Sequence, residues 1–143
     1  MHHARPPANI KHVGEIGKTY YLHQAVKQDF DDAVFIDSNN RISEGTIWNL
    51  AFWDGETIIW PEAGMLKGTM MTMVQRQLTK LNIPQRTESV TLEYLAKLKG
   101  AAVMNSWTPG VSVGEISTQK FMLSNELLEL LHKAYKNETA EEV

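Results

Sequence analysis

The chain has 143 residues, 43% of them hydrophobic, which is enough to bury one core, so we expect a single domain. Its formal net charge is −3 and 22% of its residues are charged, a balance that gives no reason to expect nucleic acid or a membrane surface as partner. It has no cysteine, which excludes disulfides, cysteine metal ligands and a cysteine nucleophile. A cytoplasmic protein fits this composition.

The first part of the chain is expected to alternate between one helix and several short strands. The predicted elements are an extended arm (1–10), a helix (17–30), a buried strand (33–37), a turn (38–41), a long strand (42–53), a hairpin turn (Asp54–Gly55) and a return strand (57–60). Pro6 and Pro7 resist helix in the arm. Asn40 can adopt the left-handed conformation that its turn needs.

The second part adds helices between further strands. The predicted elements are a loop (61–67), a helix from Gly68–Thr69 to the residues before Pro84, a strand (87–90), a helix from Thr91 to Lys99 that stops at Gly100, a strand (101–106), a turn (Pro109–Gly110), a strand or hairpin (111–122), a helix (125–136) capped by Ser124, and an acidic, frayed tail (137–143). The hairpin signals favour an α+β domain with mainly antiparallel sheet.

Four segments carry chemically useful groups in a definite order, and Glu44 follows Lys11 by 33 positions (44 − 11). The segments are Ile10–Lys11, Asp32–Asp37 leading to Glu44 and Asn49, Leu66–Met70, and Asn105–Pro109. As an ordered set they resemble the larger, C-terminal domain of the class IV aminotransferases. These are the fold-type IV pyridoxal 5′-phosphate (PLP) enzymes, which include branched-chain and D-amino acid aminotransferases and aminodeoxychorismate lyase.

The resemblance implies roles for the lysine and the carboxylate. Lys11 matches the lysine that forms an imine with the cofactor and then moves a proton between the substrate and the cofactor. Glu44 matches the carboxylate that keeps the pyridine nitrogen protonated, so that the ring withdraws electrons. Without the resemblance, Lys11 could be a solvated lysine beside a linker, and Glu44 could be a strand-end glutamate that faces water.

The other matching segments imply contacts with the cofactor phosphate. Gly68, Thr69 and Met70 match the turn before a helix, where a glycine lets the backbone approach and free N–H groups bind the phosphate. Many relatives carry threonine and arginine where this chain has Met70 and Met71, so those two side-chain roles do not carry over. Asn105 and Ser106 match a second phosphate contact. Asn49 is interpreted as structural, holding its strand locally.

The resemblance also implies a domain layout. Residues 1–10 correspond to an interdomain linker, residues 11–136 to the PLP-binding large domain, and residues 137–143 to a frayed tail, while the family's N-terminal domain is absent from this sequence. The implied fold is that of D-amino acid aminotransferase, with antiparallel hairpins in a barrel-like sheet and packed helices. Apolar residues are candidates for a face that meets the missing domain, although core packing is the simpler interpretation. They are Tyr20, Tyr21, Met70, Met71 and Met73.

Three functions remain open from the sequence. The first is transfer of an amino group between an amino acid and a 2-oxo acid. The second is an aminodeoxychorismate lyase-like reaction, and the third is a truncated, non-catalytic PLP-fold module that acts in interactions. A homodimer is implied by the family. No metal site is expected, because His12, His23 and His132 lack ligand spacing.

Overall fold

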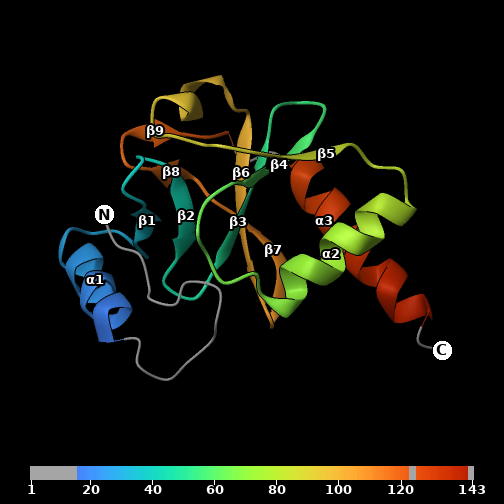
Figure 1. The fold of residues 1–143 in the computed structure, drawn as a ribbon, viewed down its shortest axis with the longest axis horizontal. Helices are drawn as coiled ribbons and strands as arrows, with labels where there is room; N and C mark the ends of the chain where they lie inside the picture. The colour runs from blue at the N-terminus through green and yellow to red at the C-terminus, as the bar shows by residue number, and fades with distance from the viewer. Residues whose placement is uncertain (1–15, 123–124, 142–143) are drawn as a thin grey trace.

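The computed structural model of this chain describes residues 16–122 and 125–141, and it has a central sheet with helices packed around it (Figure 1). The elements are α1 (Ile16–Lys27), β1 (Val34–Ile36), β2 (Ile42–Gly45), β3 (Asn49–Trp53), β4 (Ile58–Pro61), α2 (Thr69–Lys80), β5 (Gln85–Glu88), the 3₁₀ turn η1 (Tyr94–Lys97), β6 (Gly100–Asn105), β7 (Thr108–Ser112), β8 (Glu115–Ile116), β9 (Gln119–Lys120) and α3 (Asn125–Glu141). The predicted α+β class with mainly antiparallel pairing is confirmed.

The sheet forks at β3. Along one edge β3 pairs with β6 over its whole length, from Asn49 opposite Met104 to Trp53 opposite Gly100. Its other edge is shared, because Asn49 pairs with β2 while the far end of the strand pairs with β4. Among the described strands only β4 and β5 pair in parallel, and α2 connects them. Within the described residues this seven-stranded sheet is open, so the expected barrel-like closure is not present there.

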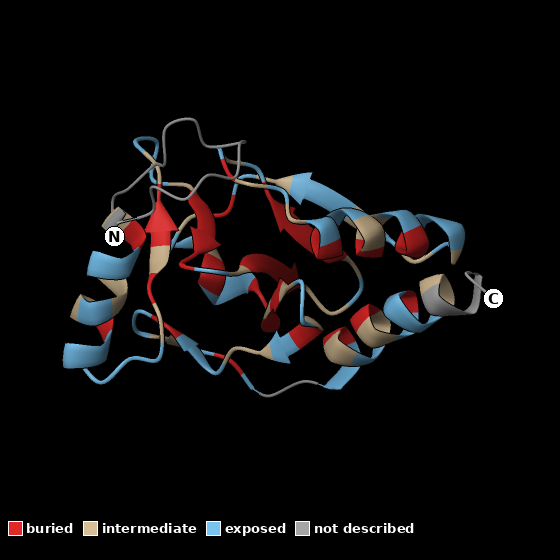
Figure 2. Ribbon diagram, turned by 90° about the horizontal axis from the view of Figure 1, so that it is seen from below, coloured by how far each residue is buried: buried red, intermediate tan, exposed pale blue. Residues whose placement is uncertain are grey.

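Two apolar clusters cover the two faces of the sheet. Along β3 the side chains alternate, since Ala51 and Trp53 belong to the cluster under α2 and α3, whereas Leu50 and Phe52 belong to the cluster under η1 and the β8–β9 hairpin. Figure 2 shows the central strands as buried and the outward faces of the helices as exposed. The strands are therefore buried on both faces, which removes the polar alternation that usually marks a strand in a sequence.

The chain reversal after α1 explains why this helix ends at Lys27 rather than at the predicted residue 30. Asp29 has a left-handed backbone, with φ of 64°, and the Phe30 N–H donates to the Ala25 carbonyl at 3.0 Å. This bond is the hallmark of a Schellman C-cap. The left-handed conformation predicted for Asn40 is confirmed, with φ of 60°.

The long strand predicted over 42–53 is wrong, because the chain folds back within it. The Gly45 N–H donates to the Trp48 carbonyl at 2.9 Å, and this tight turn separates β2 from β3. The Thr46 hydroxyl donates to Asp32 Oδ1 at 2.6 Å, which holds the turn from the side. The turn has no proline, asparagine or aspartate, so its sequence carries little signal beyond Gly45.

The turn predicted at Pro109–Gly110 is also misplaced. Both residues lie in β7, and the hairpin turn is formed by Ser106 and Trp107. The Trp107 N–H donates to Asn105 Oδ1 at 3.0 Å. Proline is tolerated in β7 because this strand pairs only with β6 among the described strands. The predicted segment 111–122 contains the end of β7 and then the short β8–β9 hairpin.

The helix predicted from Thr91 to Lys99 is only the 3₁₀ turn η1. The predicted cap Thr91 lies before it: its Oγ1 accepts the Tyr94 N–H at 3.2 Å, but the N-cap residue of η1 is Glu93, which makes no side-chain cap hydrogen bond. The Lys99 N–H donates to the Trp53 carbonyl at 2.7 Å, so the chain has already joined the sheet before the predicted stop at Gly100, which begins β6. Tertiary pairing therefore ends this helix early.

Two further elements differ from their predicted bounds: the strand after α2 and the C-terminal end of the last helix. The predicted strand at 87–90 is β5, two residues earlier, and it pairs parallel to β4. The tail expected to fray from residue 137 is helical to Glu141, while the predicted cap Ser124 lies outside the described residues. In the described part of the chain, none of the helices has the length and apolar character needed to cross a bilayer.

Candidate functional site

The predicted carboxylate Glu44 is buried at the end of β2, directly opposite Asn49 of β3. The tight β2–β3 turn creates this pairing, because it places two residues that are five positions apart on facing strands (49 − 44). A pocket of about 410 Å³ opens beside them. Its lining residues are Lys18, Glu44, Thr46, Ile47, Trp48, Asn49, Leu66, Lys67, Gly68, Thr69, Asn105, Ser106 and Trp107.

Asn49 connects the sheet to the loop before α2. Its Nδ2 donates to the Leu66 carbonyl at 2.8 Å, and its Oδ1 accepts the Gly68 N–H at 3.1 Å. A Cβ atom added at Gly68 would lie 2.8 Å from Asn49 Oδ1, which is too close for a carbon. This close approach, and not the backbone conformation, favours glycine at position 68, since its φ of −66° is open to any residue.

The start of α2 faces the same pocket. Gly68 occupies the N-cap position and offers no side-chain cap to the helix. The first N–H groups of an α-helix have no partner within the helix, and together with the helix dipole they favour a bound anion. Thr69 lines the pocket beside them, and Ser106 comes from the β6–β7 turn, so two hydroxyl groups border the same region.

Glu44 also forms a buried ion pair. Lys18 Nζ lies 3.1 Å from Glu44 Oε1, and the two side chains are only 7% and 9% exposed. Lys18 comes from α1, and its Nζ lies 5.7 Å from the centre of the Phe35 ring on β1, within the range of a cation–π contact. The pocket thus contains a carboxylate with a cation already beside it.

The structure places five of the predicted residues in this one pocket. They are Glu44, Gly68, Thr69, Asn105 and Ser106. Met70 is buried and lines an adjoining hollow of about 570 Å³, which shares Lys67, Thr69 and Ser106 with the first pocket. The predicted lysine, Lys11, lies outside the described residues.

The sequence interpretation missed two participants. Asn49 does more than hold its strand, because it fixes the loop before α2, and nothing in the sequence indicates that contact. The second participant is Lys18, which precedes Tyr21 and Ala25 by three and seven positions. That helical spacing puts it on the buried face of α1 and could have identified it.

The apolar residues proposed for an exposed face divide between surface and core. Tyr20 is 58% exposed, whereas Met70 and Met71 of α2 are buried in the apolar cluster between this helix and the sheet. Met73 is partly buried against the same cluster. Core packing therefore accounts for the methionines.

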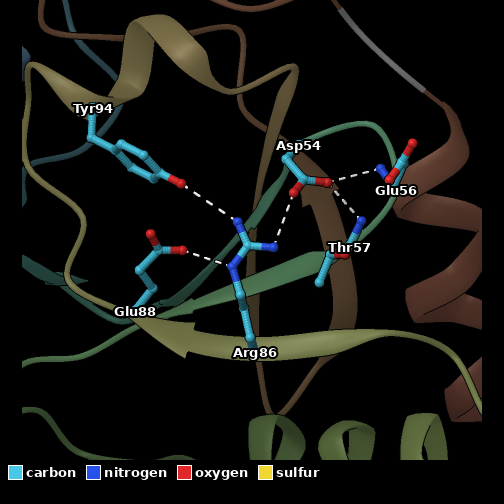
Figure 3. Close-up of polar contacts among 6 residues, drawn as sticks. All are labelled: Asp54, Glu56, Thr57, Arg86, Glu88 and Tyr94. Carbon is cyan, nitrogen blue, oxygen red and sulfur yellow. Dashed lines mark hydrogen bonds and ion pairs between the residues drawn. The ribbon is translucent and has the colours of Figure 1, made fainter.

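A second polar cluster lies at the opposite end of β3, around Arg86 (Figure 3). Arg86 Nε donates to Glu88 at 2.7 Å and its terminal nitrogens donate to Asp54 at 3.0 Å and to the Tyr94 hydroxyl at 3.5 Å. Hydrogen bonds to Glu88, Tyr94 and Asp54 raise the pKa of Arg86. Burial raises the pKa of Asp54, but N–H donors of Glu56 and Thr57 and the Arg86 guanidinium outweigh it and leave that pKa lowered. This cluster ties the β3–β4 turn to β5.

Among the described residues, no group of three or more His, Cys, Asp or Glu side chains is arranged to hold a metal ion. The pocket instead combines a buried carboxylate at one wall with a helix N-terminus and hydroxyl groups at another. Such a donor set suits a ligand that carries a protonated ring nitrogen and a phosphate.

Solved structures with the same fold include enzymes of two related activities. A Legionella pneumophila protein described as a 4-amino-4-deoxychorismate lyase has a TM-score of 0.87 and 19% identity, covering 94% of this chain and 51% of its own. The branched-chain aminotransferase of Thermoproteus uzoniensis, solved with norvaline, has a TM-score of 0.77 and 16% identity, covering 94% and 50%. A hypothetical aminotransferase from Mycobacterium tuberculosis, in a PLP-bound form, has a TM-score of 0.76 and 14% identity, covering 86% and 44%.

At these identities the likeness shows the fold, and the chain spans about half the length of these structures. No curated protein sequence matches the chain significantly. The family model for class IV amino-transferases matches residues 1–116, a range that includes the candidate lysine and the whole lining of the pocket. The chain belongs to the class IV aminotransferase family.

Proposed function

We propose that this chain forms the cofactor-binding part of a PLP-dependent enzyme that transfers an amino group between an amino acid and a 2-oxo acid. The observation that carries the proposal is the placement of Glu44, which is buried in the wall of the pocket that the α2 N-terminus borders. PLP is the cofactor of the class IV aminotransferase family, to which the chain belongs.

The residues of the pocket fit this cofactor at both of its charged ends. Glu44 would accept a hydrogen bond from a protonated ring nitrogen, and a buried carboxylate strengthens such a charge-assisted bond. The N–H groups at the start of α2, with the hydroxyls of Thr69 and Ser106, would hold the phosphate. When bound, PLP supplies an electron sink for the electrons released at the amino-acid Cα.

Lys11 is proposed as the residue that attaches the cofactor as a Schiff base and moves the proton at the substrate Cα. The sequence supports this role, since Lys11 precedes Glu44 by 33 positions, as the resemblance to the family requires. Asn105 is proposed to support the phosphate end indirectly, because its Oδ1 accepts the Trp107 N–H and so shapes the turn that presents Ser106.

A lyase-type reaction is the second candidate. The segment Asn105–Pro109 resembles the lyase branch of the family more than the aminotransferase pattern, and the Legionella pneumophila protein with the same fold is described as a lyase. A non-catalytic PLP-fold module is a further alternative. By analogy with the family we also propose a homodimer and a cytoplasmic location.

The test is chemical trapping of the cofactor. The purified chain is incubated with PLP, reduced with borohydride and digested, and the modified peptide is identified by mass spectrometry. We expect a phosphopyridoxyl group on Lys11 and loss of this label in Lys11→Ala. Labelling of Lys18 or Lys67 in the unaltered chain, both of which line the pocket, would contradict the role of Lys11.

Absence of any label in folded protein would contradict cofactor binding through a lysine. To separate the two reactions, the loaded protein is mixed with an amino acid. A transaminase converts bound PLP to its amine form and releases a 2-oxo acid, whereas a lyase releases a cleavage product and keeps its cofactor unchanged. If neither occurs although PLP is bound, the non-catalytic alternative is favoured.

A further inference from the structure

The buried ion pair between Lys18 and Glu44 joins two elements that are distant in the sequence. Lys18 Nζ and Glu44 Oε1 are 3.1 Å apart, and both side chains are more than nine-tenths buried. Burying two charges is costly, and an apolar pair of similar volume often packs at least as stably. Stability alone is therefore a weak reason for this pair, and its position in the pocket needs another explanation.

The surroundings hold Lys18 in place. Its ammonium lies 5.7 Å from the centre of the Phe35 ring, and Phe35 is 1% exposed. The same ring meets Tyr21 edge-on, with centroids 5.8 Å apart, so α1 is packed against β1 just beyond Lys18. Lys18 is thus a buried, packed residue of the pocket wall rather than a surface lysine.

The pair has a consequence for any ligand that approaches Glu44 with a positive charge. A carboxylate has two oxygens and about four acceptor sites, so a donor at Oε1 does not exhaust its capacity. However, a neighbouring ammonium cancels much of the negative potential that a second cation would feel, and this loss is large where water is excluded. A protonated pyridine nitrogen would meet a carboxylate that is already neutralised.

We propose that Lys18 is the resident counter-ion of Glu44 and competes with the protonated ring nitrogen of the cofactor for this carboxylate. Lys18 keeps the buried carboxylate compensated when the pocket holds no cofactor, and it weakens the binding of the ring when the cofactor arrives. Lys18 is in this view a positioning residue, since it acts through Glu44. The inference rests on the proposed function, in which Glu44 binds the ring nitrogen.

The test measures binding rather than turnover. The probe is pyridoxine 5′-phosphate, which has no aldehyde and so cannot attach to a lysine, and whose ring nitrogen is protonated at neutral pH. Its deaza analogue, in which carbon replaces the ring nitrogen, is the matched ligand. Dissociation constants are measured by calorimetry for the full chain, Lys18→Met, Lys18→Gln and Lys18→Arg. Lys27→Met is the control, because Lys27 is exposed on the same helix.

We expect Lys18→Met and Lys18→Gln to bind pyridoxine 5′-phosphate on the order of tenfold more tightly, since the competing charge is gone. Lys18→Arg and Lys27→Met should match the unaltered chain. The deaza analogue should bind all five proteins equally, because it brings no charge to Glu44. Lys18→Gln keeps a polar side chain, so it remains informative if the methionine variant fails to fold.

Equal affinity of the unaltered chain and Lys18→Gln for pyridoxine 5′-phosphate would overturn the counter-ion role while leaving the proposed function intact. An equal gain in affinity for both ligands would also overturn it, because the effect would then come from pocket shape rather than charge. If the unaltered chain and the variants bind neither ligand, the proposed function fails and the counter-ion role fails with it.

Discussion

The absence of a side chain at Gly68 allows the close contact with Asn49 that shapes one wall of the pocket. Its missing side chain lets Asn49 reach across and hold the backbone at Leu66 and Gly68 through two hydrogen bonds. The loop before α2 is thereby tied to β3, the strand that also pairs with the end of β2 carrying Glu44. Asn49 thus links the wall of the pocket that carries Glu44 to the wall formed by the start of α2.

We expect Gly68→Ala to destabilise the chain by about 1–3 kcal/mol, because the new methyl group would lie 2.8 Å from Asn49 Oδ1 and must displace it. The same change should weaken pyridoxine 5′-phosphate binding. Urea unfolding and calorimetry measure the two effects. Gly114→Ala is the matched control, since an added Cβ there meets nothing within 4 Å.

A double-mutant cycle tests whether the contact between position 68 and Asn49 causes this loss of stability. In an Asn49→Ala background the added methyl group has room, so the further cost of Gly68→Ala should fall. If Gly68→Ala costs the same in both backgrounds, the contact with Asn49 does not explain the requirement for glycine.

Among the elements, the β3–β4 hairpin depends on its turn and on the strand beside it. Asp54 accepts the N–H groups of Glu56 and Thr57 at 2.8 and 2.7 Å, which builds the predicted Asp-Gly turn. Gly55 has φ of 104°, a conformation that this residue permits without strain. Arg86 of β5 then binds Asp54 at 3.0 Å and holds the turn against the parallel strand.

This arrangement predicts an acid-dependent loss of stability. Because the pKa of folded Asp54 lies below its ordinary value of 3.8, its ion pair stabilises the fold above that pH and is lost as the pH falls through the lowered pKa. Asp54→Asn should therefore cost about 0.5–1 kcal/mol at pH 7, since Arg86 is 42% exposed and solvent screens the pair. The cost should shrink toward zero in strong acid.

Urea unfolding of both proteins at neutral and at strongly acidic pH measures this difference. Asp31→Asn serves as the control, because Asp31 is exposed in the loop after α1. A difference between Asp54→Asn and the unaltered chain that stays constant with pH would show that the turn hydrogen bonds, and not the ion pair, account for it.

In the whole molecule, the pairing of α2 with α3 completes the core over one face of the sheet. Gln77 of α2 is fully buried, and it accepts a hydrogen bond from Asn137 Nδ2 at 2.6 Å and donates one to Glu138. The last turns of α3 thus satisfy a buried amide of another helix. This contact explains why the acidic C-terminal segment is helical, although its composition alone predicts fraying.

Deleting residues 137–143 should therefore destabilise the chain by about 1–3 kcal/mol, because the buried Gln77 amide loses its hydrogen bonds to Asn137 and Glu138. Thermal and urea unfolding measure the loss. Gln77→Leu should recover part of it in the shortened chain but should destabilise the full-length chain, where the partners remain. If the leucine variant gives no recovery, lost helix length rather than the loss of these two hydrogen bonds explains the effect.

Much of the fold could be predicted from the sequence, because local signals mark many elements. The Asp-Gly turn, the left-handed Asn40, the Thr91 hydrogen bond before η1 and the helix after Gly68 are encoded by residues close in the chain. The β2–β3 turn could not be predicted in this way. It lies among strands buried on both faces, and its stabilising partner, Asp32, is fourteen positions away.

The candidate site also has some features that local sequence predicts and others that depend on tertiary contacts. The sequence by itself determined the family, the presence of a lysine and a glutamate at the spacing of a PLP enzyme, and the glycine that opens α2, since these depend on residue type and order. Only the tertiary structure decided that Glu44 faces Asn49, that Asn49 holds the loop at Gly68, and that Lys18 forms an ion pair with Glu44. These contacts join separate elements, and their geometry depends on side-chain packing that no local pattern records.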